Sequence, residues 1–167
     1  MLRKIIVPLD GSKVAEAVLP FVEEIVFGLK RGIKGEVTLL HVLSPTYYVV
    51  AGEAGAPVPY TDAEIEQIKN KTMDYLDKLG EGLRSKGAIV ECKVGVGRAA
   101  EEINKVADEI NADLVAMSTH GRSGLSRWAF GSVTDRVLRG GNRPVLMVRV
   151  PRETEKPKPT SDEEKDG

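Results

Sequence analysis

Glycines and hydroxyl side chains gather in one stretch of the sequence, between residues 118 and 134. The stretch follows an apolar run at 114–117 and precedes a helical pattern that begins near Ser132. A helix start presents backbone N–H groups without intrahelical partners, together with the positive end of the helix dipole, and glycine lets an anion approach them closely. The stretch is therefore a candidate phosphate-binding loop, although strand-to-helix turns also carry Gly and Ser for geometric reasons alone.

Short apolar segments alternate with amphipathic segments on either side of this loop. We expect strands over residues 4–9, 36–42, 88–94, 113–118 and 144–150, and helices over residues 13–29, 61–86, 99–111 and 132–141. Thr61 and Glu64 form a capping box, and Pro20 is expected to kink the first helix. Regular alternation of strands and helices predicts a parallel α/β sheet with right-handed crossovers.

Five parallel strands allow two common orders, and each order creates a ligand crevice in a different place. In the order 3-2-1-4-5 the reversal lies between the first and fourth strands, which puts Asp10 opposite the loop that starts at Ser118. In the order 2-1-3-4-5 it lies between the first and third strands, which puts Asp10 opposite Gly95 instead. The spacing of residues leaves both orders open.

Composition narrows the classes of function. The 24 Lys and Arg residues balance the 25 Asp and Glu residues and mix with them along the chain, so nothing favours nucleic acid or an anionic membrane as a partner. The single Cys92 and the two histidines have no metal-ligand or disulfide spacing. Pro8 and Asp10 cut the first apolar run far below the length of a signal or membrane span, which predicts a cytoplasmic protein.

Two stretches lie outside the alternating pattern. Residues 45–60 carry Tyr47 and Tyr48 and then Gly, Ala and Pro, and they are too long for a tight connection. They predict a mobile excursion that serves as a lid or partner surface. Residues 151–167 have proline and mixed charge with no large apolar side chain, so they cannot offset their ordering entropy. We therefore expect one domain over residues 1–150 and a disordered charged tail over 151–167.

Several motifs in this order resemble the universal stress protein family. The matching segments are VPLDGS at 7–12, LHV at 40–42, STHG at 118–121, GSVT after nine further residues at 131–134, and NRPVLMV at 142–148. The resemblance covers residues 2–150. It implies a three-layer Rossmann-like α/β fold, with helices on both faces of a five-stranded parallel sheet of order 3-2-1-4-5.

Members with the signature G-x-x-G, nine residues and G-S/T bind ATP, so the resemblance implies an ATP site, with Mg²⁺ as an optional companion ion. Asp10 would accept hydrogen bonds from the ribose, the Val42 backbone would face the adenine, and the residues from Gly131 onward would cradle phosphates. Ser132 is also expected to be the N-cap of the last helix. The expected contact residues are Pro8, Leu9, Asp10, Val42, Met117, Ser118, His120, Gly121, Arg122, Gly131, Ser132, Val133 and Thr134. In this chain Ser118 replaces the first glycine of the signature.

The last expected strand, which starts at Pro144 and ends at Val150, is an apolar edge of the sheet in the order 3-2-1-4-5. An exposed apolar edge favours pairing with another strand, and family members form dimers through this strand. We therefore expect a homodimer, with further protein partners that the sequence does not identify.

Three functional hypotheses remain. The first is a nucleotide-binding regulatory protein of the stress response, with at most slow ATP hydrolysis, because no residue is placed as a general base. The second is a dimeric interaction protein of the same family that binds no nucleotide, and Ser118 is its only support. The third is a phosphoacceptor receiver or flavin carrier, which is disfavoured because the third and fifth strands end without the required aspartate and lysine.

Overall fold

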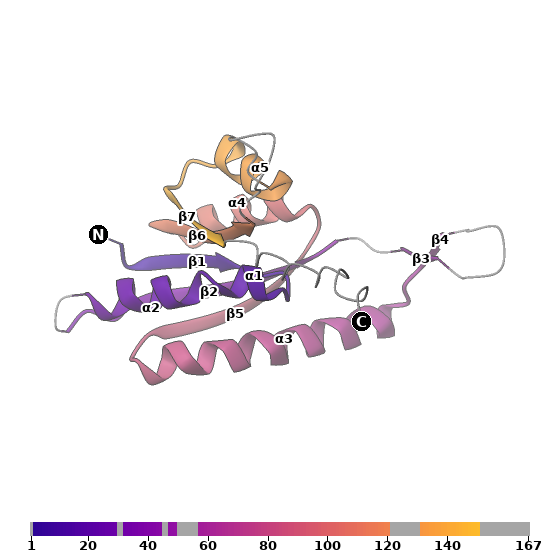
Figure 1. The fold of residues 1–167 in the computed structure, drawn as a ribbon. Helices are drawn as coiled ribbons and strands as arrows, with labels where there is room; N and C mark the ends of the chain where they lie inside the picture. The colour runs from indigo at the N-terminus through magenta and orange to yellow at the C-terminus, as the bar shows by residue number, and fades with distance from the viewer. Residues whose placement is uncertain (1, 30–31, 45–46, 50–56, 121–130, 151–167) are drawn as a thin grey trace, which may run out of the picture.

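Five parallel strands form the main sheet of the protein (Figure 1). The computed structural model describes residues 2–29, 32–44, 47–49, 57–120 and 131–150. The sheet contains β1 (Lys4–Pro8), β2 (Glu36–Leu43), β5 (Ile89–Val96), β6 (Leu114–His120) and β7 (Val145–Val150). Their spatial order is β5-β2-β1-β6-β7. The order 3-2-1-4-5 is therefore confirmed, and the alternative with the third strand beside the first is excluded.

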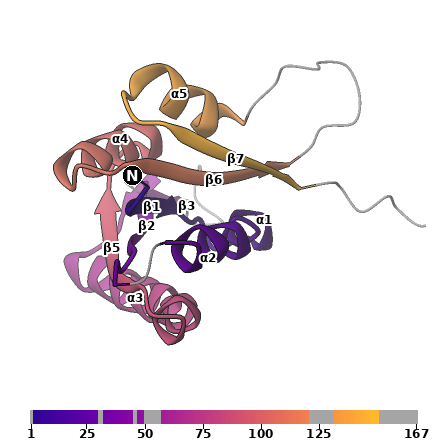
Figure 2. The same ribbon diagram turned by 90° about the vertical axis from the view of Figure 1, so that its left-hand side faces the viewer.

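Helices cover both faces of this sheet (Figure 2). One face carries α1 (Lys13–Glu16), α2 (Leu19–Phe27) and α3 (Asp62–Ser85), and the other carries α4 (Ala99–Glu109) and α5 (Ser132–Gly140). The three layers confirm the predicted Rossmann-like architecture. No helix in the described ranges is long and apolar enough to cross a membrane.

The central strands bury side chains on both faces, because successive residues of a strand point to opposite sides. In β6, Leu114 and Ala116 belong to the core under α2 and α3, whereas Val115 and Met117 belong to the core under α4 and α5. The same alternation turns Ser118 toward the face that carries α1. This parity determines which wall of the ligand crevice each residue at the end of β6 can reach.

The first predicted helix is interrupted near Pro20. Helix α1 ends at Glu16, helix α2 begins at Leu19, and Pro20 lies in the first turn of α2. Proline has no N–H group to donate to the carbonyl four residues earlier, here that of Glu16, so the hydrogen-bond ladder cannot continue through it. The predicted kink is therefore a complete break that creates two short helices.

Helix α3 begins and ends where the sequence predicts. The Thr61 hydroxyl accepts the Glu64 N–H at 3.3 Å, and the Glu64 carboxylate accepts the Thr61 N–H at 2.8 Å, which completes the capping box. After the helix, Gly87 has a φ of +92°, a left-handed conformation that glycine adopts without strain. Asn111 has a φ of +50° just after α4, where it was predicted to end that helix.

Part of the predicted excursion at 45–60 forms a short antiparallel pair. Strands β3 (Tyr47–Val49) and β4 (Pro57–Pro59) pair with each other and project away from the main sheet (Figure 1). Residues 45, 46 and 50–56 of this stretch and the predicted tail at 151–167 lie outside the described residues. Their expected mobility and disorder, and the division of the chain at residue 150, therefore stay predictions.

Candidate functional site

A pocket opens beyond the carboxyl ends of β1 and β6, where the order of the strands reverses. Its volume is about 300 Å³. Such a switch point is where ligands bind in open α/β sheets. The predicted contact residues that line it are Pro8, Leu9, Asp10, Val42, Met117, Ser118, Gly131, Ser132, Val133 and Thr134. The fold therefore brings the N-terminal and C-terminal halves of the predicted set together around one cavity.

Three predicted contact residues cannot be placed around this pocket. Gly121 and Arg122 lie outside the described residues. His120 is the last residue of β6, where it pairs with Val150 of β7, but its side chain is also outside the description. The expected contacts of these three residues with a nucleotide stay predictions.

Asp10 follows the end of β1 and holds a tight turn. Its Oδ1 atom accepts the Ser12 N–H at 2.9 Å, and the Ser12 hydroxyl accepts the Ala15 N–H at 3.1 Å as the N-cap of α1. Burial raises the pKa of the Asp10 carboxyl, but the hydrogen bonds from Ser12 outweigh burial, and His41 adds a smaller effect in the same direction. The net pKa is below its ordinary value, so Asp10 is an ionised acceptor at neutral pH.

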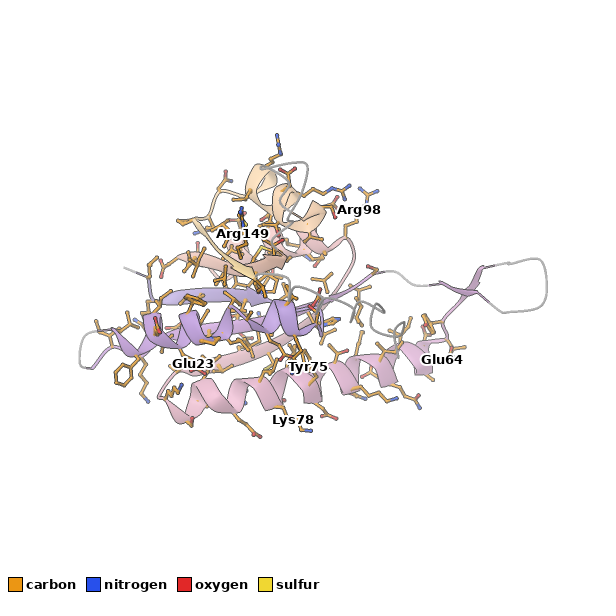
Figure 3. All side chains as sticks on the ribbon, in the orientation of Figure 1. Glu23, Glu64, Tyr75, Lys78, Arg98 and Arg149 are labelled. Carbon is orange, nitrogen blue, oxygen red and sulfur yellow. The ribbon has the colours of Figure 1, made fainter. Side chains whose placement is uncertain are left out.

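His41 and Tyr75 lie near Asp10 on the α1–α3 side of the sheet. Tyr75 reaches from α3 toward α1 (Figure 3), and its hydroxyl donates to Glu16 Oε1 at 3.2 Å. Burial lowers the pKa of His41, although the charge of Asp10 opposes this effect. The buried His41 Nδ1 atom has no hydrogen-bond partner among the described residues. The imidazole is therefore mainly neutral at pH 7.

The start of α5 forms the opposite wall of the pocket. Gly131 is its N-cap, with φ −55° and ψ 151°, and no side chain of the described residues caps the helix. The predicted N-cap role of Ser132 is wrong, because Gly131 holds the extended cap position and Ser132 is the first helical residue. The first backbone bond to the cap runs from Asp135 N–H to Gly131 O at 2.9 Å. In this part of the described chain, the N–H groups of Ser132, Val133 and Thr134 thus have no protein acceptor.

Ser118 turns its hydroxyl away from α5 and toward α1. The Ser118 hydroxyl has one proton, which the carbonyl oxygens of Val14, 2.5 Å from Oγ, and Ala15, 3.0 Å from Oγ, share as acceptors. This direction follows from the alternation of side chains along β6. The serine at the first signature position is therefore already engaged within the protein.

Some lining residues were absent from the predicted set. They are Ser12, Val14, Ala15, Leu40, Ala99, Ile103 and Thr119. The sequence could have predicted that Ser12 lines the pocket. Ser12 follows Asp10 and Gly11 as the N-cap of the first helix, and this position lies at the same end of the sheet as the crevice. The apolar residues carried no such signal, since the same pattern fits an ordinary helix core.

This strand order, with a pocket at the switch point, defines a doubly wound α/β protein. The family model described as the Universal stress protein family matches residues 1–149. The chain therefore belongs to the universal stress protein family.

Two archaeal relatives illustrate the similarity. The chain is 31% identical over 160 residues to Universal stress protein MJ0577 of Methanocaldococcus jannaschii. The matched region covers 89% of this chain and 96% of the relative. The solved structure of MJ0577 matches with a TM-score of 0.67 at 29% identity over 92% of this chain and 99% of that chain. A universal stress protein from Archaeoglobus fulgidus, solved in complex with dAMP, matches with a TM-score of 0.58 at 25% identity over 88% and 98% of the two chains.

Proposed function

We propose that the protein binds an adenine nucleotide, with ATP as the leading ligand, in the pocket between β1 and β6. The observation that carries this proposal is the meeting of an ionised carboxylate, Asp10, with the uncapped start of α5 across one cavity. A ribose hydroxyl donates to a carboxylate, and phosphate oxygens accept from open backbone N–H groups. The dAMP complex of the Archaeoglobus fulgidus relative supports this class of ligand.

The base would lie against the apolar part of the pocket. Leu40, Val42, Ile103 and Met117 line that part. The last backbone bond between β1 and β2 joins Leu9 N–H to the Leu40 carbonyl at 2.8 Å. Val42 lies two residues further along β2, beyond the register of β1, so its backbone is available to the edge of an adenine. Apolar walls with a few polar groups are typical of small-molecule sites.

The triphosphate would lie at the start of α5. The N–H groups of Ser132, Val133 and Thr134 and the Ser132 hydroxyl would donate to its oxygens. Among the described residues, no group of three or more His, Cys, Asp or Glu side chains could hold a metal ion. A Mg²⁺ ion would therefore be held chiefly by the phosphates.

We also infer that two copies pair through β7 to form a homodimer. Val115 N–H donates to the Pro144 carbonyl at 2.9 Å, so the backbone carbonyl of Pro144 points toward β6. Successive residues of a strand point their backbone N–H and C=O groups to opposite sides. Met147, three residues later, therefore points these groups toward the open edge of the sheet. A Met147→Pro substitution would remove an edge donor without removing a bond to β6. Sedimentation should show a dimer for the wild type and a monomer for Met147→Pro, and a monomeric wild type would contradict the inference.

A nucleotide-free interaction protein is the less supported alternative. It depended on Ser118, which replaces the first glycine of the signature. The Ser118 hydroxyl points to α1, and a cavity of about 300 Å³ remains beside it. This volume is at the lower end of the roughly 300–1,000 Å³ typical of ligand pockets. The replacement of glycine by serine therefore does not argue against nucleotide binding.

Thermal unfolding of nucleotide-free protein with and without ATP tests the proposed function. At an ATP concentration about 100 times Kd, binding should stabilise the fold by about 2.7 kcal/mol, which raises the Tm by about 5–10 °C. AMP and adenosine should stabilise it less, because they lose contacts at α5. The absence of stabilisation by every adenine nucleotide would contradict the proposal. The cytoplasmic location and any role in a stress response stay predictions.

A further inference from the structure

Ser118 occupies the first position of the G-x-x-G signature, where a hydroxyl at a phosphate site would be expected to face the ligand. Its two acceptors instead belong to the helix break before Pro20. In a continuous helix, the carbonyls of Val14 and Ala15 would accept the N–H groups of residues 18 and 19. Here the Val14 carbonyl accepts Ala17 N–H at 3.2 Å, and no backbone N–H in the described ranges donates to the Ala15 carbonyl. The single proton of the Ser118 hydroxyl therefore takes the place of a backbone donor that the break removes.

Three hydrogen bonds, joined through residues Ala15 and Ser12, link Ser118 to Asp10. The Ser118 hydroxyl donates to the Ala15 carbonyl at 3.0 Å. The N–H of the same Ala15 donates to the Ser12 hydroxyl at 3.1 Å. The Ser12 N–H then donates to Asp10 Oδ1 at 2.9 Å. The end of β6 thereby fixes α1, and α1 fixes the carboxylate at the end of β1, across the switch point of the sheet.

We propose that Ser118 is a positioning residue that holds Asp10 in place for the ribose and makes no contact with the phosphates. The proposal rests on the proposed nucleotide binding. It reverses the expectation from the signature, because restoring the family glycine by Ser118→Gly removes the link to α1. That substitution should weaken ATP binding, although it also removes a Cβ from the pocket.

A pair of nucleotides separates a role at the ribose from a role at the phosphates. Both ATP and 2′,3′-dideoxy-ATP carry the triphosphate, but only ATP offers ribose hydroxyls to Asp10. In Ser118→Ala, affinity for ATP should fall about three- to tenfold, as expected for a misplaced hydrogen bond, while affinity for dideoxy-ATP should stay unchanged. Ser118→Thr keeps the hydroxyl and should restore ATP affinity. Ser132→Ala is the matched control, because it should weaken both nucleotides equally.

A double-mutant cycle gives a second, independent measurement. If Ser118 acts through Asp10, adding Ser118→Ala to an Asp10→Ala background should cause no further loss of ATP affinity. Calorimetric titrations of the four proteins would show this. The ligand-free Ser118→Ala protein should also unfold about 2–6 °C below the wild type, because it loses its bonds to α1.

Several outcomes would overturn the positioning role. Equal losses for ATP and dideoxy-ATP in Ser118→Ala would assign the hydroxyl to the phosphates. Unchanged affinities with a lower Tm would reduce Ser118 to a purely structural residue. Additive losses in the cycle would show that it acts independently of Asp10. If the wild type binds no adenine nucleotide, both the proposed function and the positioning role fail. If the wild type binds ATP and Ser118→Ala binds it equally well, only the positioning role fails.

Discussion

The two walls of the pocket differ in how the protein already uses their polar groups. On the wall formed by β1 and α1, Asp10, Ser12 and Ser118 are joined to one another through backbone and side-chain hydrogen bonds. On the wall formed by α5, the first N–H groups and the Ser132 hydroxyl have no capping bond among the described residues. Internal bonds hold a group in position, whereas open donors are left for a ligand. Substitutions on the first wall should therefore change stability and binding together, and those on the second should chiefly change binding.

Removal of the carboxylate at Asp10 should have the largest effect. Asp10→Ala deletes a charged acceptor, which should lower ATP affinity about 10- to 100-fold. It also leaves the Ser12 N–H without its acceptor, so the Tm should fall by a few degrees. Calorimetry and thermal unfolding measure the two effects.

Asp10→Asn is the matched control for that substitution. It keeps a side-chain oxygen for Ser12 but removes the charge. It should recover most of the Tm and only part of the affinity. If Asp10→Ala weakened binding and left stability unchanged, the wall of β1 and α1 would not be linked as described.

The two glycines that bracket α5 should separate binding from stability. A Cβ at Gly141 would lie 2.5 Å from Asn104 Oδ1 and 2.9 Å from the Val137 carbonyl, so Gly141→Ala must shift its surroundings. It should lose about 1–3 kcal/mol of stability. A Cβ at Gly131 would lie 3.5 Å from Thr119 Oγ1, an ordinary contact. Gly131→Ala should lose less stability, roughly 0.5–1 kcal/mol, because alanine is a poorer N-cap residue than glycine. It should also bind ATP several-fold more weakly, because it adds bulk to a residue that lines the proposed phosphate site.

Denaturant unfolding measures the first effect of this pair and calorimetric titration measures the second. Equal losses of stability in the two variants would mean that the α5 wall is as tightly packed at Gly131 as at Gly141. Such a result would remove the contrast between the two ends of the helix.

Ser132→Ala should have a moderate effect on binding and almost none on folding. The Ser132 hydroxyl does not cap α5, because Gly131 occupies the cap position. Its removal should change the Tm by less than about 1 °C, as for a surface substitution. ATP affinity should fall about tenfold, near the lower limit for the loss of a hydrogen bond to a charged group, because Ser132 is exposed and water can replace part of the bond. A fall of several degrees in Tm would show that this hydroxyl stabilises the helix start.

The smallest expected effect is a dependence of stability on pH, and it comes from His41 on β2, beside Asp10 of the first wall. Burial lowers the pKa of His41 below 6.5. The unfolded chain then takes up a proton at a higher pH than the folded protein, so stability falls as the pH drops below about 6.5 and levels off once folded His41 is protonated. Asp10, whose pKa is also lowered, acts in the same direction only at more acidic pH.

Denaturant unfolding between pH 5 and pH 8 tests this dependence. A His41→Asn variant should show a flatter profile than the wild type, because it cannot take up the proton. A Ser132→Ala variant should keep the wild-type profile. Identical profiles for wild type and His41→Asn would exclude His41 as the source.

The sequence was sufficient to predict the five strands of the main sheet, the start of α3 at Thr61, the end of α4 near Asn111 and, through the family resemblance, the strand order. It did not predict β3 and β4. Ten of the predicted contact residues line the pocket at the switch point, because the carboxyl ends of parallel strands share one edge, and their contacts with a nucleotide stay a prediction. The sequence missed other lining residues. It could not predict the partners of Ser118. Those acceptors are carbonyls of α1, which ends at Glu16 instead of continuing into α2, about 100 residues earlier in the chain.

The cap of α5 was missed for a different reason. Serine is a preferred N-cap residue and glycine offers no side-chain acceptor, so the sequence favoured Ser132. The cap position is set by the last extended residue before the helix, and that residue is Gly131. Local preference therefore misplaced the cap by one residue, which is the usual uncertainty of a helix boundary.

Amide NMR of nucleotide-free protein during an ATP titration tests the central claim most directly. The open N–H groups at the start of α5 should be where the phosphates bind. The account predicts that the amide signals of Ser132, Val133 and Thr134 shift in a saturable manner, and that their hydrogen exchange slows at saturation. ATP that binds without perturbing these three amides, or that does not bind at all, would contradict it.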